Sequence, residues 1–280
     1  MVPCASCGGS VFKPALDCEG FGFVRCASCG LVQMNPQPVK DEIIARYSRT
    51  SGQDYLSYEL ENEASFLKLQ QLGLKDAGFY DWEETLFSRA GEQQPSVLDI
   101  GCATGALLDF LRQRECGWRV TGVEISPGAD YAQRERNLDV RNTPLEECNF
   151  PDGSFDAVLA SHLIEHLNDP RSFLNEVYRI LKDTGRVFIT TPNISGFQAR
   201  LCGSLWRSAI FDHLYLFSIR TLTKLLTSAN FKVEKISTWG GIAAGLAPLW
   251  IKKPADFLAK RLGFGDVMIV RAKKSAPRKN

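Results

Sequence analysis

The residues with the most specific chemical spacing are four cysteines, arranged as two Cys-x-x-Cys knuckles, Cys4/Cys7 and Cys26/Cys29. A glycine follows the second thiol of each knuckle, which is typical of a tight turn. Two such turns can present four thiolates tetrahedrally to one Zn²⁺ ion. Because the protein would supply all four ligands, we expect the zinc to be structural. Disulfide bonds and a redox pair are the alternatives, and a cytoplasmic location disfavours the disulfides.

A second pattern is the glycine turn in the segment VLDIGCATGALLDFL, residues 97–111. The apolar run before the turn predicts a buried strand, and the leucines after it recur with helical spacing. Backbone N–H groups at a strand-to-helix turn are available to a polar ligand. A dinucleotide-binding turn needs a middle glycine that admits the pyrophosphate, and Ala103 stands at that place here. The turn therefore favours a ligand without a pyrophosphate.

Two acidic residues accompany this turn. Asp99 would repel a phosphate, whereas it suits the amino group of a methionine moiety. Glu124 stands 25 positions later at the end of the next expected strand, where a carboxylate can bind both ribose hydroxyls of a nucleoside. A helix cap at Asp99 and a solvated strand end at Glu124 are the structural alternatives. Acids at two matching strand ends favour ligand binding over both alternatives.

The elements that must position these residues follow from the apolar periodicity after residue 95. Short apolar strands alternate with amphipathic helices, which predicts an α/β fold with a doubly wound, mostly parallel sheet. We expect strands at 97–100, 120–124, 140, 157–160, 187–190, 233–237 and 267–270, with the last two antiparallel at the edge. Ser126-Pro127, Asp169-Pro170 and Ser218 are typical helix starts. The ligand crevice of such a sheet lies at the carboxyl ends of its strands.

Four segments of the chain, VLDIGCATG, VTGVEIS, NFPDGSFDAVLASHLIEHLNDP and GRVFITTPN, resemble the successive motifs of class I S-adenosylmethionine-dependent methyltransferases. The resemblance covers residues 95 to about 272 and implies a Rossmann-like, seven-stranded, mostly parallel sheet with an antiparallel edge strand. We therefore predict a zinc-ribbon module at 1–40, a helical lead-in at 41–92 and a methyltransferase domain at 93–275.

The same resemblance implies where S-adenosylmethionine binds. Asp99, Gly101 and Gly105 would line its methionine part, Glu124 its ribose, and the segment around Leu145 its adenine. This family often has an aspartate before that last segment, and Thr143-Pro144 stands there instead, so backbone groups and packing would recognise the adenine. The full set of expected cofactor-binding residues is Asp99, Gly101, Cys102, Gly105, Glu124, Ile125, Leu145 and Ser161.

All three histidines, His162, His166 and His213, follow expected strand ends on the ligand side. Methyl transfer to a hydroxyl needs a base with a pKa near neutrality, and histidine fits that need. His162 and His166 have a spacing that places them on one helical face beside Glu165, without an evident third ligand for a metal. The expected catalytic candidates are His213, as base or substrate contact, and His166, which is as suited to holding a backbone carbonyl.

A zinc ribbon before a methyltransferase core resembles a subgroup of small-molecule and sugar methyltransferases. We expect a small-molecule or glycan acceptor, with O-methylation favoured over methylation of carbon or nitrogen. The apolar segment 194–217, with its interspersed arginines, is compatible with a pocket lid or with peripheral contact to a membrane, for example at a lipid-linked sugar. The structural alternative for this segment is a helix packed on the sheet.

The composition and the charge of the chain bear on the other possible classes of function. With 33 Lys and Arg against 32 Asp and Glu, the net charge of +1 argues against nucleic acid as a partner. An RNA-base methyltransferase with a zinc module is still the second enzyme hypothesis, and a non-catalytic protein that binds the cofactor and a partner is the third. The N-terminus lacks the features of a signal peptide, and no uncharged apolar window reaches the ~18 residues of a membrane span, so we expect a cytoplasmic protein.

Overall fold

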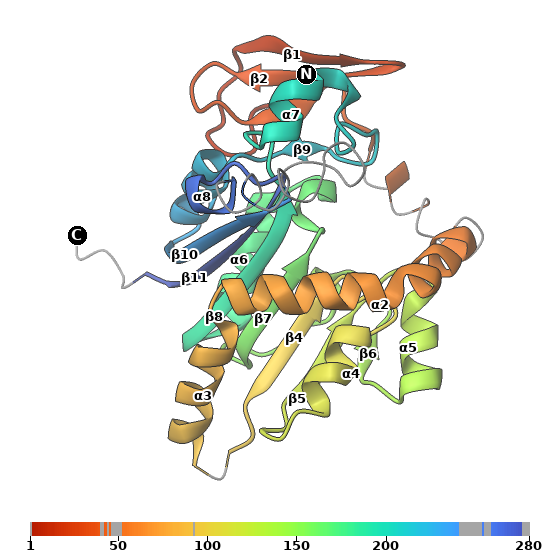
Figure 1. Cartoon of the computed structure of the whole chain (residues 1–280), viewed down its shortest axis with the longest axis vertical. Coiled ribbons are helices and arrows are strands. Elements are labelled where there is room, and N and C mark those ends of the chain that lie inside the picture. The colour runs from red at the N-terminus through yellow and green to blue at the C-terminus, as the bar shows by residue number, and fades with distance from the viewer. Residues whose placement is uncertain are drawn as a thin grey trace.

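A computed structural model of the chain describes residues 2–39, 42, 43, 45, 52–91, 93–240, 254 and 259–275, without the side chains of 52–54. Residues 40, 41, 44 and 46–51, at the junction between the predicted ribbon and the predicted lead-in, lie outside the described residues. Two sheets make up the structure, a small one at the top of Figure 1 and a larger one below it.

The larger sheet has seven strands in the order β10-β11-β8-β7-β4-β5-β6, which confirms the predicted fold class. Their bounds are Ser96–Ile100 (β4), Arg119–Val123 (β5), Val140–Arg141 (β6), Phe155–Ser161 (β7), Leu181–Pro192 (β8), Phe231–Trp239 (β10) and Val267–Lys274 (β11). Strands β6, β5, β4, β7 and β8 pair in parallel. Strand β11 is antiparallel to both β8 and β10, so the antiparallel strand lies second from the edge rather than at it.

Helices cover both faces of this sheet, because its parallel strands are apolar on both sides. Every residue of β4 is buried. The helices are Gly52–Asp76 (α2), Phe79–Ala90 (α3), Ala106–Arg112 (α4), Gly128–Arg136 (α5), Pro170–Ile180 (α6), Phe197–Cys202 (α7) and Ile219–Ser228 (α8), with short 3₁₀ turns at Leu145–Glu147 (η1), Ile164–His166 (η2) and Gly203–Leu205 (η3). Asp169 and Ser218 cap α6 and α8 through their side chains, as their sequence positions predict.

The small sheet combines N-terminal strands with a strand from the far end of the chain. Strands Phe12–Cys18 (β1), Phe21–Cys26 (β2) and Val32–Met34 (β3) form an antiparallel meander. Strand Tyr215–Leu216 (β9), from the segment after β8, adds to β3 as the fourth strand. Buried side chains of this sheet, among them Phe23 and Met34, belong to the same hydrophobic core as β7, β8 and α6.

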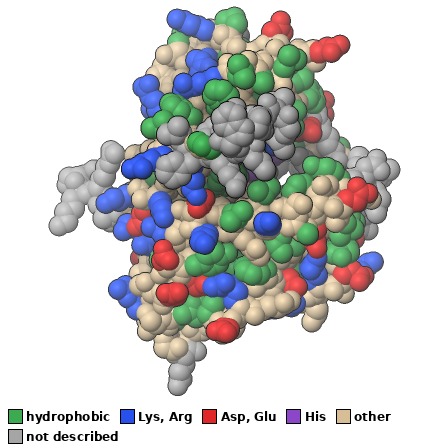
Figure 2. Space-filling view, in the orientation of Figure 1, with side chains coloured by type: hydrophobic (Ala, Val, Ile, Leu, Met, Phe, Trp, Pro, Cys, Tyr) green, Lys and Arg blue, Asp and Glu red, His purple; other side chains and the backbone are tan. Residues whose placement is uncertain are grey.

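Figure 1 shows helix α2 running across the view near the upper end of β4, with β10 and β11 above it and α3 below it beside the sheet. Buried Glu83 fixes α3, because its carboxylate pairs with the Arg114 guanidinium and accepts a 2.5 Å hydrogen bond from Trp118 Nε1. Figure 2 shows basic and acidic side chains interspersed over the larger sheet and its helices on the face in view. Among the described residues, no helix has the length and apolar character that crossing a membrane requires.

Two glycines with left-handed backbones provide a matched test of packing at the glycine turn. Gly105 has φ +76°, and a Cβ there would lie 2.6 Å from Leu138 Cδ1 and 3.0 Å from Ala132 Cβ. Gly153 has φ +61° with no atom within 4 Å of an added Cβ. Both alanine variants carry the left-handed strain of roughly 1 kcal/mol, and Gly105→Ala adds overpacking of about 2 kcal/mol.

We therefore expect urea unfolding to show a clearly larger loss of stability for Gly105→Ala than for Gly153→Ala. Equal losses would mean that the space behind the turn relaxes without cost.

Candidate active site

The glycine turn joins β4 to α4 through three residues in the left-handed region. Gly101, Ala103 and Gly105 have φ values of 74°, 48° and 76°. Glycine adopts this conformation without strain, whereas alanine does so at a cost. Gly128, the first residue of α5, avoids a clash with the turn, because a Cβ there would lie 2.7 Å from the carbonyl oxygen of Ala103. Two neighbouring elements therefore approach each other closely at this point.

Glu124 connects the turn to the next strand end. Its Oε2 accepts a 2.9 Å hydrogen bond from the backbone N–H of Ala103, and its Oε1 accepts a 2.8 Å bond from that of Ser126. The carboxylate is 8% exposed. A charged acceptor bonded to backbone N–H groups makes strong hydrogen bonds. Glu124 therefore fixes the geometry of the turn and keeps a negative charge at the carboxyl edge of the sheet.

Asp99 lies directly behind the turn and is 2% exposed. Its Oδ1 is buried and has no hydrogen-bond partner within the described part of the chain. Burial, and secondly the charge of Glu124, raise the pKa of Asp99 to about 8. A buried carboxyl without a partner is costly, which makes this position suited to a cationic or hydrogen-bonding ligand group.

Helix α2 contributes further carboxylates from above the turn. Glu63 Oε2 accepts a 2.6 Å hydrogen bond from Thr104 Oγ1, and its Oε1 pairs with Arg136 Nη2 at 2.6 Å. One turn earlier, burial and then the charges of Glu124 and Glu63 raise the pKa of Glu59 against opposing contributions from Tyr55 and His162. Sequence reasoning missed both glutamates, although their four-residue spacing places them on one face of a helix.

The other predicted cofactor residues lie at the same edge of the sheet. Gly101 and Cys102 are in the turn, and the Cys102 Sγ packs where a Cβ of Gly122 would be. Ile125 follows Glu124 and is half-buried. Leu145 opens η1 after β6 and is buried, and Ser161 is the last residue of β7. All eight residues thus lie within or after the carboxyl ends of β4, β5, β6 and β7.

A second cluster gathers all three histidines around the carboxylate of Glu165, which is fully buried. His162 Nδ1 lies 3.2 Å from Glu165 Oε1, and Thr191 Oγ1 donates to Oε2 at 2.9 Å. The rings of His166 and His213 contact each other edge to face, with centroids 4.7 Å apart. His162 adopts a left-handed backbone (φ 52°) ahead of η2, so the pair His162/His166 is not on one helical face as predicted.

Backbone carbonyls fix the orientation of two of these rings. The Nδ1–H of His166 donates to the carbonyl of Asp212 at 2.9 Å, and that of His213 to the carbonyl of Ser208 at 2.8 Å. These bonds set the tautomer whose Nε2 carries the lone pair. Burial lowers the pKa of His213 to about 4, although the charge of Glu165 opposes this shift. His213, 7% exposed, is therefore a neutral imidazole at physiological pH.

The pKa of Glu165 is also lowered, but in its case the shift favours the charged form. Its burial alone would raise the pKa, but the hydrogen bond and charge of His162, with the charges of His166 and His213, lower the pKa to about 2. Glu165, His166 and His213 each place a possible ligand atom within 4.8 Å of the others, a spacing that also suits a metal ion. Both oxygens of Glu165 already accept hydrogen bonds, which favours a proton-holding hydrogen-bond network over a metal site at this cluster. Sequence analysis named Glu165 only as a neighbour and missed its central place.

The four knuckle cysteines converge as predicted. Cys4 Sγ lies 3.4 Å from Cys29 Sγ and Cys7 Sγ 3.5 Å from Cys26 Sγ, and all four sulfurs are within 4.8 Å of one another. Sulfurs about 3.8 Å apart are what a tetrahedral site with Zn–S bonds of ~2.3 Å requires. None of the four forms a disulfide. Burial raises the pKa of Cys4, whereas backbone N–H groups of Cys29 and Ser28 outweigh burial at Cys26 and lower its pKa to about 7.

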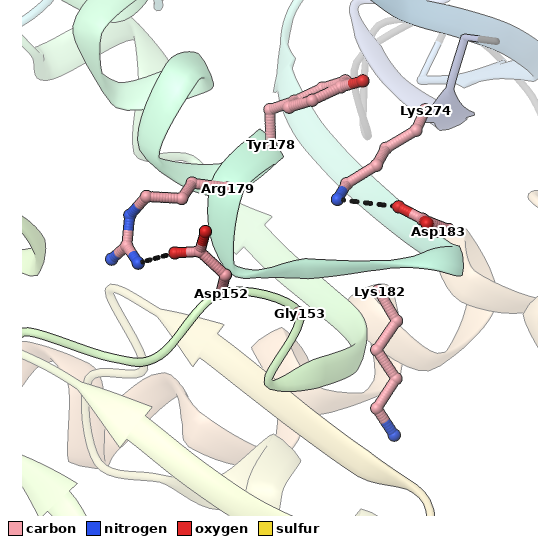
Figure 3. A pocket seen from close by; sticks show the side chains of 7 residues that line it. All are labelled: Asp152, Gly153, Tyr178, Arg179, Lys182, Asp183 and Lys274. Carbon is pink, nitrogen blue, oxygen red and sulfur yellow. Dashed lines mark hydrogen bonds and ion pairs between the residues drawn. The ribbon is translucent and has the colours of Figure 1, made fainter. Parts of the chain in front are cut away.

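A separate surface hollow of about 590 Å³ lies at the opposite edge of the larger sheet. Figure 3 shows its lining side chains, which come from the loop before β7, the end of α6, the start of β8 and the end of β11. Two of its cations are already paired, Arg179 with Asp152 at 2.5 Å and Lys274 with Asp183 at 3.2 Å. The predicted ligand residues lie at the carboxyl edge instead, so we do not assign this hollow to the active site.

Comparison with known proteins shows the family to which the chain belongs. A family profile described as a methyltransferase domain matches residues 76–236, more than half of the chain. A protein of Mycolicibacterium smegmatis named as an S-adenosylmethionine-dependent methyltransferase is 32% identical over 158 residues, covering 55% of this chain and 58% of the relative. A ubiquinone biosynthesis O-methyltransferase of Pseudomonas aeruginosa is 34% identical over 113 residues, covering 38% and 47% respectively. The chain spans about half the length of these curated relatives.

Solved structures share the fold. A chain from the complex between the Haloferax volcanii Trm112 methyltransferase activator and a methyltransferase aligns with a TM-score of 0.52 and 20% identity, covering 75% of this chain and 97% of that chain. An S-adenosylmethionine-dependent methyltransferase of Thermotoga maritima aligns with a TM-score of 0.51 and 22% identity, with the same coverage. At these identities the likeness concerns the fold alone.

The neutral His213 predicts a pH dependence of stability. Its folded pKa of about 4 lies below the ordinary value of ~6.5, so the unfolded state binds a proton that the folded state does not. The stability that His213 contributes is complete above pH ~6.5 and is lost as the pH falls towards 4, by about 3 kcal/mol at most. We expect His213→Gln to flatten the dependence of the unfolding free energy on pH in that window, measured by urea denaturation. Parallel profiles for the two proteins would contradict the assignment.

Proposed function

We propose, on the premise that the chain belongs to the methyltransferase-domain family, that it transfers a methyl group from S-adenosylmethionine to a small-molecule acceptor. The observation that carries the proposal is the group of acids at the carboxyl edge of the sheet, with Asp99 buried and unpartnered behind the turn. The methionine end of this cofactor carries an ammonium and a sulfonium, which are the charges that such a site attracts. A dinucleotide would instead bring phosphates towards Asp99 and Glu124.

The roles of the turn residues follow from their places. Asp99 and the turn residues Gly101 and Gly105 would hold the methionine part. Glu124 would bind the ribose hydroxyls, exchanging its present bonds to Ala103 and Ser126 for bonds to the ligand. Leu145 and Ile125 offer apolar contact for the adenine. Cys102 and Ser161 would complete the lining of the cofactor site.

S-adenosylmethionine supplies an activated methyl group, so the protein has to orient the acceptor and remove its proton. His213 is our candidate to take that proton at Nε2, because its Nδ1–H is held by the carbonyl of Ser208 and its ring is neutral, although its pKa of about 4 lies below the near-neutral value that a general base favours. The charge of Glu165 would stabilise the imidazolium that forms. His166, in contact with the His213 ring, would position it or meet the acceptor.

We propose oxygen as the accepting atom, because a hydroxyl is the group whose methylation most needs a base. The O-methyltransferase activity in the name of the Pseudomonas relative agrees with this choice. A glycan, including a lipid-linked one, is the finer proposal for the acceptor, and it rests on the combination of a zinc ribbon with this core. RNA is the second candidate and is disfavoured by the net charge of +1.

We also propose that Cys4, Cys7, Cys26 and Cys29 bind a structural Zn²⁺ ion. Three of the four side chains are buried in the core of the small sheet, and the sulfur spacings fit a tetrahedral ion. With four protein ligands the ion has no open position for a substrate. It would hold the two knuckles together and would not act as a Lewis acid on the substrate.

Calorimetric titration with S-adenosylmethionine tests the cofactor proposal. We expect Glu124→Ala to weaken binding at least tenfold, because it removes the ribose acceptor and frees the turn. Glu135→Ala, an exposed glutamate on the neighbouring helix α5, is the matched control and should bind as the native protein does. Absence of binding by the native, zinc-loaded protein at millimolar cofactor would refute the proposed activity.

Metal analysis tests the zinc proposal. We expect about one equivalent of zinc in the native protein, a loss of most of it in Cys26→Ser, and a lower thermal midpoint of that variant. Cys202→Ser, at an exposed thiol in α7, controls for the removal of a cysteine and should keep the metal. If Cys26→Ser retained its full metal content, the four-cysteine assignment would be wrong.

A further inference from the structure

The small sheet is connected to the histidine cluster by backbone hydrogen bonds. Strand β3 pairs with β9 through Val32 opposite Leu216 and Gln33 opposite Tyr215. The pairing continues to the residue before β9, because the N–H of Met34 donates to the carbonyl of Leu214 at 2.8 Å. The N-terminal sheet thus extends to within one residue of His213.

The same residue is held from its other side by the cluster. The N–H of Leu214 donates to the carbonyl of Glu165 at 2.7 Å. Leu214 is therefore bonded to β3 through its oxygen and to the central residue of the histidine cluster through its nitrogen. Its side chain is fully buried. Movement of β3 would displace Leu214 and, with it, the neighbouring His213.

A second connection starts inside the first cysteine knuckle. Arg171, in the first turn of α6, donates from Nη2 to the carbonyl of Ser6 at 2.6 Å. Ser6 lies between Cys4 and Cys7, so the folding of this knuckle sets the position of that carbonyl. Close by, Tyr215 of β9 donates from its hydroxyl to the carbonyl of Asn168, and the Asn168 amide donates to the carbonyl of Pro38. Both connections end on the segment that runs from Glu165 to α6.

The glycine turn is held by other parts of the chain. Its hydrogen bonds come from Glu124 after β5, from Glu63 on α2 and from Arg136 on α5. Its elements, β4, α4 and β5, lie below the small sheet in Figure 1. The two halves of the proposed active site therefore have different hydrogen-bonded supports, and they meet where the side chain of Leu163 packs against Gly101.

We propose that the four-cysteine module is a positioning element for the acceptor side of the active site, so that loss of its zinc displaces His213 and His166 while the cofactor site stays intact. The proposal rests on the function proposed above and assigns the zinc a role in that function. Release of the metal would then stop methyl transfer in a protein that still holds its cofactor. Arg171 is the positioning residue that links the first knuckle to α6.

Histidine labelling tests this proposal without knowledge of the acceptor. The chain has only three histidines, so the full-length protein carrying histidine labelled with ¹³C at Cε1 gives three ring signals, which single His→Asn variants assign. We expect zinc removal by a chelator to shift or broaden the signals of His166 and His213. The dissociation constant for S-adenosylmethionine should change by less than about twofold. Re-addition of zinc should restore the spectrum.

Two outcomes would overturn the proposal. Unchanged signals of His166 and His213 after complete zinc removal would show that the two sites are independent. A parallel loss of cofactor binding would show that the metal supports the whole fold rather than one side of the site. If the zinc-loaded protein bound no S-adenosylmethionine at all, the proposed activity would fail, and the histidine signals would still report on the coupling.

A variant at Arg171 keeps the test valid if zinc-free protein aggregates. We expect Arg171→Ala to retain zinc and cofactor affinity and to move the His166 and His213 signals in the direction seen on zinc removal. Arg171→Lys, which keeps a donor and the charge, should restore part of the native spectrum. Arg220→Ala, at an exposed arginine on α8, is the matched control and should leave the three signals in place. If zinc-loaded Arg171→Ala gave the native spectrum, Arg171 would not link the first knuckle to the histidine cluster.

Discussion

The buried carboxylate of Glu165 is the constraint on which the arrangement of this protein depends. It holds His162 and Thr191 through its two oxygens, and its backbone carbonyl fixes Leu214 beside His213. A charge without exposure is tolerated only when it is fully paired, so each of these partners has to be in place. One residue thereby joins the end of β7, the end of β8 and the strand that completes the small sheet.

Much of the larger sheet could be predicted from the sequence because its cause is local. Val97 and Leu98 lie in an apolar run that only a strand buried on both faces explains, and Asp169-Pro170 marks a helix start by its capping chemistry. The four-cysteine cluster could also be predicted from the sequence, since the Cys-x-x-Cys spacing is typical of a zinc ligand set. The predicted cofactor residues lie at the same edge of the sheet because its parallel strands end there.

What the sequence did not reveal depends on contacts between distant segments. Nothing local distinguishes Glu165 from a solvent-exposed glutamate, and its role emerges only when His213, nearly fifty residues later, reaches it. The same holds for Glu63, whose partner Thr104 lies forty-one residues away. Tyr215-Leu216 is too short a strand to predict from periodicity. Order of the strands at the sheet edge, with β11 inside β10, likewise follows from tertiary packing.

The pairing of β3 with β9 also has a consequence for the order in which the protein forms. The first three strands of the small sheet are synthesised before the fourth, which lies more than 180 residues further along the chain. Closing so long a loop is slow, because its entropy has to be overcome before the contact contributes. The N-terminal meander therefore completes its sheet only after most of the larger sheet has been synthesised. During that interval its open strand edge is exposed to other chains, and a metal ion that closes the knuckles early would limit the time available for mispairing.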